Sequence, residues 1–279
     1  MHFSATLLLA SAGAALAASN AQPADVAGAI GQAIAQFQGK LPLLAPLSPL
    51  SPLLAAHTAP LFHSGAQLIP TPVKTEWLEP VAALDVAFGN GTVPLGSAQQ
   101  VSDLQQRPTY TLNYTASSSA VSAVLTNSTR YTVMFIDASY YGDNSTGGNV
   151  TRHQLSNNYT LNAQTGLLEN GAPVTRYGAP LPASGDGPHR YLQLVVTQPE
   201  DFTAPAEPAQ GSGVESWDVD AYWTAAKLGK IVAMNYISVQ VGRGTKAEST
   251  STAASSVIAS ASNSAAAAFG VVSCRLAHS

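Results

Sequence analysis

The sequence has few charged residues, one cysteine and no long apolar run. Lys, Arg, Asp and Glu make up 10% of the 279 residues, against about 25% in an average soluble domain. The 12 basic and 16 acidic side chains give a net charge of −4, which argues against a nucleic-acid binder, because such a protein needs a concentrated basic face. The lone Cys274 excludes a disulfide framework and a cysteine-based metal site. No apolar run reaches the roughly 18 residues of a membrane-spanning helix.

The N-terminus has the pattern of a secretory signal. An apolar run extends from Leu7 to Leu16, and the small residues Ala15 and Ala17 match the usual cleavage pattern. We therefore predict a signal peptide over residues 1–18 and a protein that is secreted, either free outside the cell or at the cell surface.

Potential glycan acceptors support export. Six Asn-x-Ser/Thr motifs lie between residues 90 and 160, and each can carry a solubilising glycan in a secreted protein. The acceptor asparagines are Asn90, Asn113, Asn127, Asn144, Asn149 and Asn158.

The C-terminal residues 244–279 form a low-complexity tail. Between Ser249 and Ala268, 17 of 20 residues are Ser, Thr or Ala, a composition that cannot bury enough apolar surface to order itself. A glycolipid-anchor signal would place about 10–20 apolar residues after such a stalk. The end of this chain is only weakly apolar, so we favour a tail without an anchor and leave its cleavage open.

Residues 19–75 are predicted to form an N-terminal extension. Apolar residues recur at helical spacing from Asp25 to Gln38, which indicates an amphipathic helix. Seven prolines between Lys40 and Pro72 then exclude long helices and central strands. We expect the helix and the proline-rich segment to pack on the rest of the protein, with contact to a partner protein as the alternative.

Residues 76–243 are predicted to form one β domain. Short β-type runs alternate with turn residues, which is typical of an all-β sandwich. One helix-like stretch, Val219 to Leu228, precedes the last run, and the aromatics Trp217, Tyr222 and Trp223 are expected to pack it on a sheet. The expected strands are Ala83–Phe88, Thr109–Tyr114, Tyr131–Ile136, Tyr191–Val196 and Tyr236–Val241.

One acid and two histidines lie beside predicted strand ends. Asp137 ends the apolar run from Tyr131, His153 follows 16 residues later, and His189 precedes another apolar run. An imidazole can donate to phosphate, and a carboxylate can orient an imidazole or bind an amine. On spacing alone, these residues could equally be hydrogen-bonded structural residues. Neither Ser139 nor Ser184 stands in a nucleophile motif, so we predict neither catalysis nor a metal or other cofactor.

Four motifs in order resemble the phosphatidylethanolamine-binding protein family between Glu79 and Val241. The strongest is similar to the family's Pro/Gly-rich loop that runs into G-x-H-R-Y. The others are similar to the strand before D-P-D-x-P, to a central histidine element and to the late L-G-x-P-V-A-x-N-Y/F motif. They are Tyr177–Leu192, Tyr131–Asp137, Arg152–Leu155 and Leu228–Tyr236. The resemblance implies a mainly β fold, an antiparallel β-sandwich with a few peripheral helices. In composition, the chain resembles secreted fungal members.

The resemblance also implies a ligand pocket. His153 and His189 would donate to phosphate oxygens, Asp137 would orient a histidine or accept from an amine, and aromatic Tyr191 would form a wall. The lining residues would be Asp137, His153, His189 and Tyr191, with Pro182 and Gly187 at the rim. Where the family has D-P-D, this chain has Ala138 and Ser139 after the first acid. The missing second acid predicts a phosphate-type pocket with reduced preference for ethanolamine.

Two residues near the expected pocket each have two alternative roles. Arg190 is expected either to form a structural ion pair or to face solvent, because the flanking residues already face inward by strand alternation. Tyr177 is a wall residue of the pocket or a packing residue of its loop.

We therefore expect a non-catalytic protein that binds a phosphate-containing small molecule or a phospholipid head group. One alternative is an inhibitor of a serine carboxypeptidase-type protease, with the 19–75 extension making the contact. The other is a structural cell-surface glycoprotein with a vestigial pocket.

Overall fold

The computed structural model describes residues 23–39, 67–89, 91–115, 119–143, 145 and 148–242. The predicted signal peptide, most of the proline-rich segment, Asn90, Asn144 and the C-terminal tail lie outside these residues. Within them, no helix is both long and apolar enough to cross a membrane.

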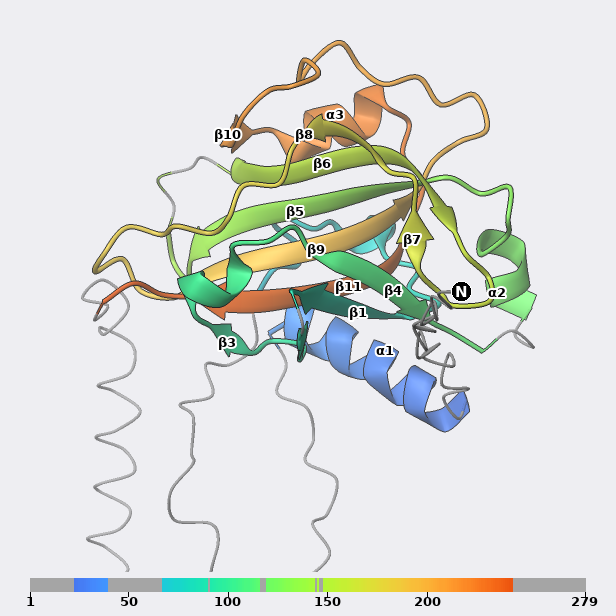
Figure 1. Cartoon of the computed structure of the whole chain (residues 1–279), viewed down its shortest axis with the longest axis horizontal. Helices are drawn as coiled ribbons and strands as arrows, with labels where there is room; N and C mark the ends of the chain where they lie inside the picture. The colour runs from blue at the N-terminus through green and yellow to red at the C-terminus, as the bar shows by residue number, and fades with distance from the viewer. Residues whose placement is uncertain are drawn as a thin grey trace, which may run out of the picture.

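A large, mostly antiparallel sheet forms the centre of the molecule (Figure 1). Its strand order is β10-β6-β5-β9-β11-β3, and the short β7 and β8 also pair with β6. The last pair, β11 with β3, is parallel. The strands are β3 (Ala98–Gln99), β5 (Tyr131–Tyr140), β6 (Val150–Leu161), β7 (Leu168–Glu169), β8 (Ala172–Thr175), β9 (His189–Thr197), β10 (Glu215–Trp217) and β11 (Ile231–Val239).

A small antiparallel sheet covers one face of the large sheet. Its order is β2-β1-β4, formed by β1 (Ala83–Phe88), β2 (Gly91–Val93) and β4 (Thr109–Asn113). The α-helices are α1 (Pro23–Phe37), α2 (Ser119–Val124) and α3 (Val219–Ala225), with short 3-10 turns η1 (Thr75–Trp77) and η2 (Val101–Leu104). The mainly β fold predicted from the sequence, a large and a small sheet with peripheral helices, is confirmed.

The large sheet has a hydrophobic layer on each face. On β5, Val133 and Phe135 pack between the two sheets, while Met134 and Ile136 pack into the layer covered by α1 and α3. A strand with both faces buried reads as a continuous apolar run rather than an alternating one. This explains the run from Tyr131 to Ile136 and its central place between β6 and β9.

The strand β6 lies within a stretch that the sequence analysis did not assign as a strand. Its sequence is rich in polar residues, yet Arg152, Gln154 and Asn157 are buried. Each has a hydrogen-bond partner from another element: Arg152 donates to Thr175, the amide of Gln154 accepts from Tyr110, and that of Asn157 accepts from Thr132. Because buried polar groups are tolerated when paired, a polar sequence can form this second central strand.

The described parts of the N-terminal extension, residues 23–39 and 67–75, pack into the core. Phe37 at the end of α1 is fully buried, and its ring lies 5.7 Å from that of Tyr236 on β11, edge to face. Leu68 and Val73 are also fully buried, and the Leu68 amide donates to the Phe37 carbonyl at 2.7 Å. The helix therefore uses its apolar face within the protein. The expected packing of the helix on the rest of the protein is therefore observed, while the alternative contact of residues 19–75 with a protease stays a prediction.

The late helix α3 packs as expected but ends earlier. It begins where the Asp218 side chain accepts from the Ala221 amide, and it ends at Ala225 rather than Leu228. Lys227 has a φ of 48°, which is incompatible with a continuing helix. Trp223 stacks on Trp77 with ring centroids 4.1 Å apart, so the helix is packed against the 3-10 turn η1.

The burial of Phe37 generates a stability prediction. Phe37→Ala is expected to lower the free energy of unfolding by about 3–5 kcal/mol, because it leaves a cavity against β11. Gln32→Ala, an exposed site on the same helix, should change it by less than about 0.5 kcal/mol. Guanidinium denaturation of both variants measures this, and equal unfolding free energies would contradict the packing of α1.

Candidate functional site

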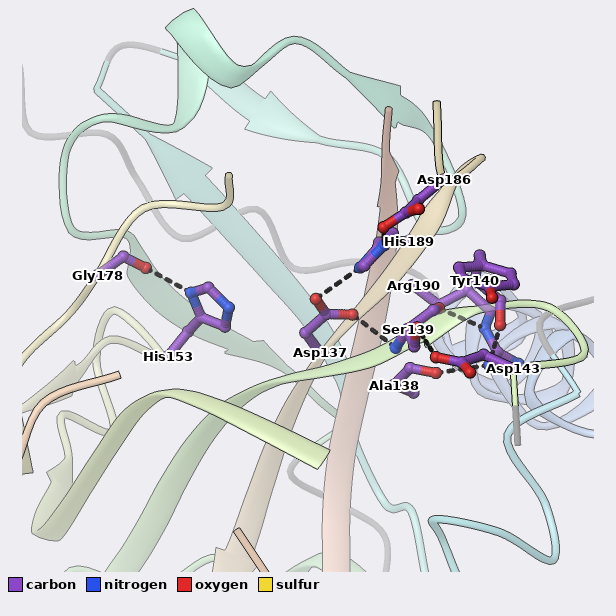
Figure 2. A network of polar contacts seen from close by, with 10 residues as sticks. All are labelled: Asp137, Ala138, Ser139, Tyr140, Asp143, His153, Gly178, Asp186, His189 and Arg190. Atoms are coloured by element: carbon purple, nitrogen blue, oxygen red, sulfur yellow. Dashed lines mark hydrogen bonds and ion pairs between the residues drawn. The ribbon is translucent and has the colours of Figure 1, made fainter. Parts of the chain in front are cut away.

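The candidate site lies where β5 ends and β9 begins. The two strands are antiparallel, and their register places Asp137 opposite Tyr191 and Tyr140 opposite His189. His153 comes from the beginning of β6, the other neighbour of β5. Figure 2 shows Asp137 between the two histidines, with His153 on one side and His189 on the other. The three residues singled out in the sequence therefore meet at one end of the large sheet.

A hydrogen bond joins Asp137 and His189. The Nδ1 atom of His189 lies 2.8 Å from Oδ2 of Asp137. The other carboxylate oxygen of Asp137 accepts from the backbone amide of Ser139 at 2.6 Å. Ser139 has a φ of 59°, so the chain turns immediately after Asp137. Both oxygens of Asp137 are thus occupied, which fixes the carboxylate and orients the His189 ring.

Arg190 holds this turn in place. Its guanidinium donates to the backbone carbonyls of Ala138 at 2.6 Å, Ser139 at 3.1 Å and Tyr140 at 3.3 Å. A fourth bond, 3.4 Å long, reaches the carbonyl of Gln67 in the N-terminal extension. Arg190 is half-buried. Arg190 thus has a structural role rather than a solvent-facing one. It fixes this turn through hydrogen bonds to backbone carbonyls, where an ion pair was expected.

Carboxylates surround His189. Burial acts to lower the pKa of His189, but the hydrogen bond and charge of Asp137, together with Asp186 and Asp143, raise it above the ordinary value. Oδ2 of Asp186 lies 3.8 Å from Nε2 of His189, which is beyond hydrogen-bond length. Nε2 is buried and has no hydrogen-bond partner. The outer nitrogen of His189, Nε2, is therefore a buried polar atom whose hydrogen bonding the described residues do not satisfy.

The His153 ring is held differently. Its Nδ1 lies 2.9 Å from the carbonyl oxygen of Gly178, and since a carbonyl only accepts, Nδ1 must carry the proton. Burial lowers the pKa of His153, with the Gly178 hydrogen bond and Asp137 opposing this effect. The ring is then neutral at pH 7, and its Nε2 is an acceptor. This differs from the donor role that the resemblance implied.

Tyr191 lies between the two imidazoles. Its ring centroid is 5.2 Å from that of His153 and 6.3 Å from that of His189. Burial raises the pKa of Tyr191, and the charge of Asp137 and a hydrogen bond to it add to the effect. Tyr191 is thus a neutral phenol that supports Asp137 as well as an aromatic neighbour of both histidines.

The loop between β8 and β9 completes the site. Pro182 and Gly187, the predicted rim residues, are both buried in it. Gly187 has a φ of 96°, which other residues rarely adopt. Tyr177, at the start of the loop, stacks on Phe135 at 5.6 Å and donates to the Leu104 carbonyl. Of its two interpretations, the structure favours packing of the loop.

Two further carboxylates lie near His189, although Ser139 stands where the resemblance placed a second acid. Asp186 approaches His189 from the loop that leads directly into β9, three residues earlier in the chain, and Asp143 accepts from the Ser139 hydroxyl at 2.6 Å. The Gly185-Asp186-Gly187 sequence just before His189 was the available signal, since two glycines let the chain turn the acid back toward the histidine.

The hydroxyl and the acids near the two histidines have the following partners among the described residues. The Ser139 hydroxyl donates to Asp143 rather than to His189. In the same part of the chain, no group of three or more His, Cys, Asp or Glu side chains is placed to hold a metal ion. The site thus places His189, whose Nε2 is buried, beside the carboxylates of Asp137 and Asp186.

Comparison with known proteins identifies the family of the chain. The family model described as phosphatidylethanolamine-binding protein matches residues 105–245. The chain belongs to this family. No curated protein sequence matches the chain as a relative.

Solved structures of low similarity were also found. One is a carboxypeptidase Y inhibitor complexed with its cognate proteinase, 18% identical over 58% of this chain and 84% of that one, with a TM-score of 0.47. The phosphatidylethanolamine-binding protein of Plasmodium falciparum is 15% identical over 62% of this chain and 92% of that one, with a TM-score of 0.45. The phosphatidylethanolamine-binding protein of Plasmodium vivax is 15% identical over 63% of this chain and 93% of that one, with a TM-score of 0.47.

The Asp137–His189 pair generates a prediction on pH. Asp137→Asn should lower the pKa of His189, because burial then acts with less opposition. Asp201→Asn, an acid in an exposed pair with Lys227, should leave that pKa unchanged. An NMR titration of the His189 ring measures both variants, and an unaltered pKa in Asp137→Asn would contradict the assigned geometry.

The same pair sets the sign of the pH dependence of stability. Since the folded-state pKa of His189 is raised, its protonated form stabilises the fold fully below the unfolded value of about 6.5. This contribution is lost as the pH rises through the folded-state value. Asp137→Asn should abolish it in denaturation measured across that range.

Proposed function

We propose that the protein is a non-catalytic binding protein for a phospholipid head group that carries both a phosphate and an ammonium group. The observation behind this proposal is the buried, unpartnered Nε2 of His189 beside the Asp186 carboxylate. A buried donor without a partner costs free energy, and a ligand oxygen would satisfy it. The adjacent carboxylate would accept from an amine on the same ligand.

The local charge favours a zwitterion over a simple anion. Asp137 and Asp186 bring two carboxylates to a single imidazole, His189, so the group carries more negative than positive charge whether or not His189 is protonated. A free phosphate would meet this negative charge uncompensated. A phosphodiester linked to an ammonium is neutral overall, and its two charged ends match His189 and Asp186. The neutral His153 provides a further acceptor at Nε2.

The family supports the same ligand class. Its name describes binding of phosphatidylethanolamine, whose head group has this pair of charges. We propose for this chain what the name states for the family, with Asp186 in place of the acid missing after Asp137.

We also propose that binding takes place outside the cell. The predicted signal peptide and the acceptor asparagines support this. Of the four acceptors described, Asn127, Asn149 and Asn158 are exposed and Asn113 is half-buried. Treating the secreted protein with peptide N-glycosidase would lower its mass if they carry glycans, and an unchanged mass would contradict N-glycosylation.

A ligand titration tests the binding site. The full chain is titrated with glycerophosphoethanolamine and with inorganic phosphate, and the ring signals of His189 and His153 are followed by NMR. We expect saturable shifts, with tighter binding of glycerophosphoethanolamine, because its ammonium group contacts Asp186. His189→Ala should abolish the binding.

Asp186→Asn is the matched variant. It keeps the shape of the side chain and removes its charge, so affinity for glycerophosphoethanolamine should fall about tenfold, while affinity for phosphate should not fall. Equal losses for both ligands would contradict the amine role of Asp186. No shift with either ligand at millimolar concentration would contradict the proposed function and favour the vestigial pocket.

A further inference from the structure

Three large apolar side chains are exposed in the described part of the chain, and all three lie at the site end of the sandwich. They are Tyr141, Leu181 and Val214, with 44%, 78% and 45% of their surface exposed. Single exposed apolar residues are ordinary on a protein surface. Their restriction to one end, the end that holds His153 and His189, is what requires an explanation.

Their positions relative to the site follow from the contacts. Tyr141 directly follows Tyr140, whose ring centroid lies 5.9 Å from that of His189. Leu181 is on the loop between β8 and β9 that delivers Asp186. Val214 lies against Gly178 of the same loop, and Gly178 is the residue bonded to His153. In Figure 1, this loop, the end of β5 and β10 lie at the same end of the molecule.

We propose that this end of the sandwich docks on the surface of a phospholipid bilayer, with Leu181 inserted below the level of the head groups. The proposal rests on the proposed function, because it names the membrane as the source of the head group. Tyr141 and Val214 would flank the inserted Leu181 at the interface. We refer to these three residues as the apolar rim.

The chemistry of a lipid ligand supports this orientation. The phosphate of a phospholipid is covalently attached to its acyl chains, so a head group bound at His189 must point its chains out of the site. The chains then leave beside the apolar rim. If this end faces the bilayer, they stay in the hydrocarbon while the head group enters the protein. Any other orientation would expose them to water.

The charges indicate a zwitterionic rather than an anionic membrane. Asp186 and Asp143 lie at this end, the guanidinium of Arg190 is directed at backbone carbonyls, and the exposed Arg176 is a single base at the start of the same loop. The chain as a whole carries a net charge of −4. Attraction to anionic lipids needs clusters of exposed Lys and Arg. The apolar rim therefore fits a surface rich in phosphatidylethanolamine and phosphatidylcholine, and insertion should depend little on salt.

Vesicle binding by the full chain tests the proposal. Vesicles of phosphatidylcholine and phosphatidylethanolamine are floated with wild-type protein, Leu181→Ser and Leu181→Met. We expect the wild type and Leu181→Met to bind alike, because methionine keeps the apolar contact. Leu181→Ser should bind about tenfold more weakly, since a buried leucine side chain is replaced by a polar one. Leu181 is exposed, so none of these variants should unfold.

The outcomes separate this proposal from the proposed function. Loss of vesicle binding in Leu181→Ser, with unchanged binding of free glycerophosphoethanolamine, supports docking through the apolar rim. If the wild type binds the free ligand but no vesicles, the docking proposal is overturned and the binding site stands. If Leu181-dependent vesicle binding occurs without binding of the free ligand, docking stands and the proposed function fails. Equal vesicle binding by Leu181→Ser and wild type also overturns docking through the rim.

Discussion

The site depends on the hydrogen bond between Asp137 and His189. It joins the end of β5 to the beginning of β9 at 2.8 Å and orients the imidazole so that Nδ1 faces the acid and Nε2 faces the loop. Arg190 makes this geometry rigid by holding the carbonyls that follow Asp137. One of its bonds also reaches Gln67, so the N-terminal extension supports the site as well as the core.

The electrostatic character of the site follows from this bond. Asp137 and its acidic neighbours keep the pKa of His189 raised, while burial lowers that of His153. The pKa values of two histidines 36 positions apart in the chain are thus shifted in opposite directions. A donor, an acceptor and the Asp186 carboxylate together match a ligand with both a phosphate and an amine, and the exposed apolar residues around them suggest where such a ligand comes from.

Much of the fold could be predicted from the sequence, because β1, β5 and β9 bury residues in regular patterns. The strand β6 could not, because its buried residues are polar and become acceptable only through partners such as Thr175 and Tyr110, which lie far away in the sequence. In the site, Asp137, His153 and His189 were found from motifs beside strand ends. Asp186 was missed because its proximity to His189 depends on the path of a loop, which has no periodic signal.

A crystal structure of the protein soaked with glycerophosphoethanolamine tests the central claim most directly. The account predicts a phosphate oxygen within hydrogen-bond distance of Nε2 of His189 and the ammonium group at the Asp186 carboxylate, with the Asp137–His189 bond intact. A ligand bound elsewhere, or an Asp186 side chain that closes directly on Nε2 and leaves the site without ligand, would contradict it.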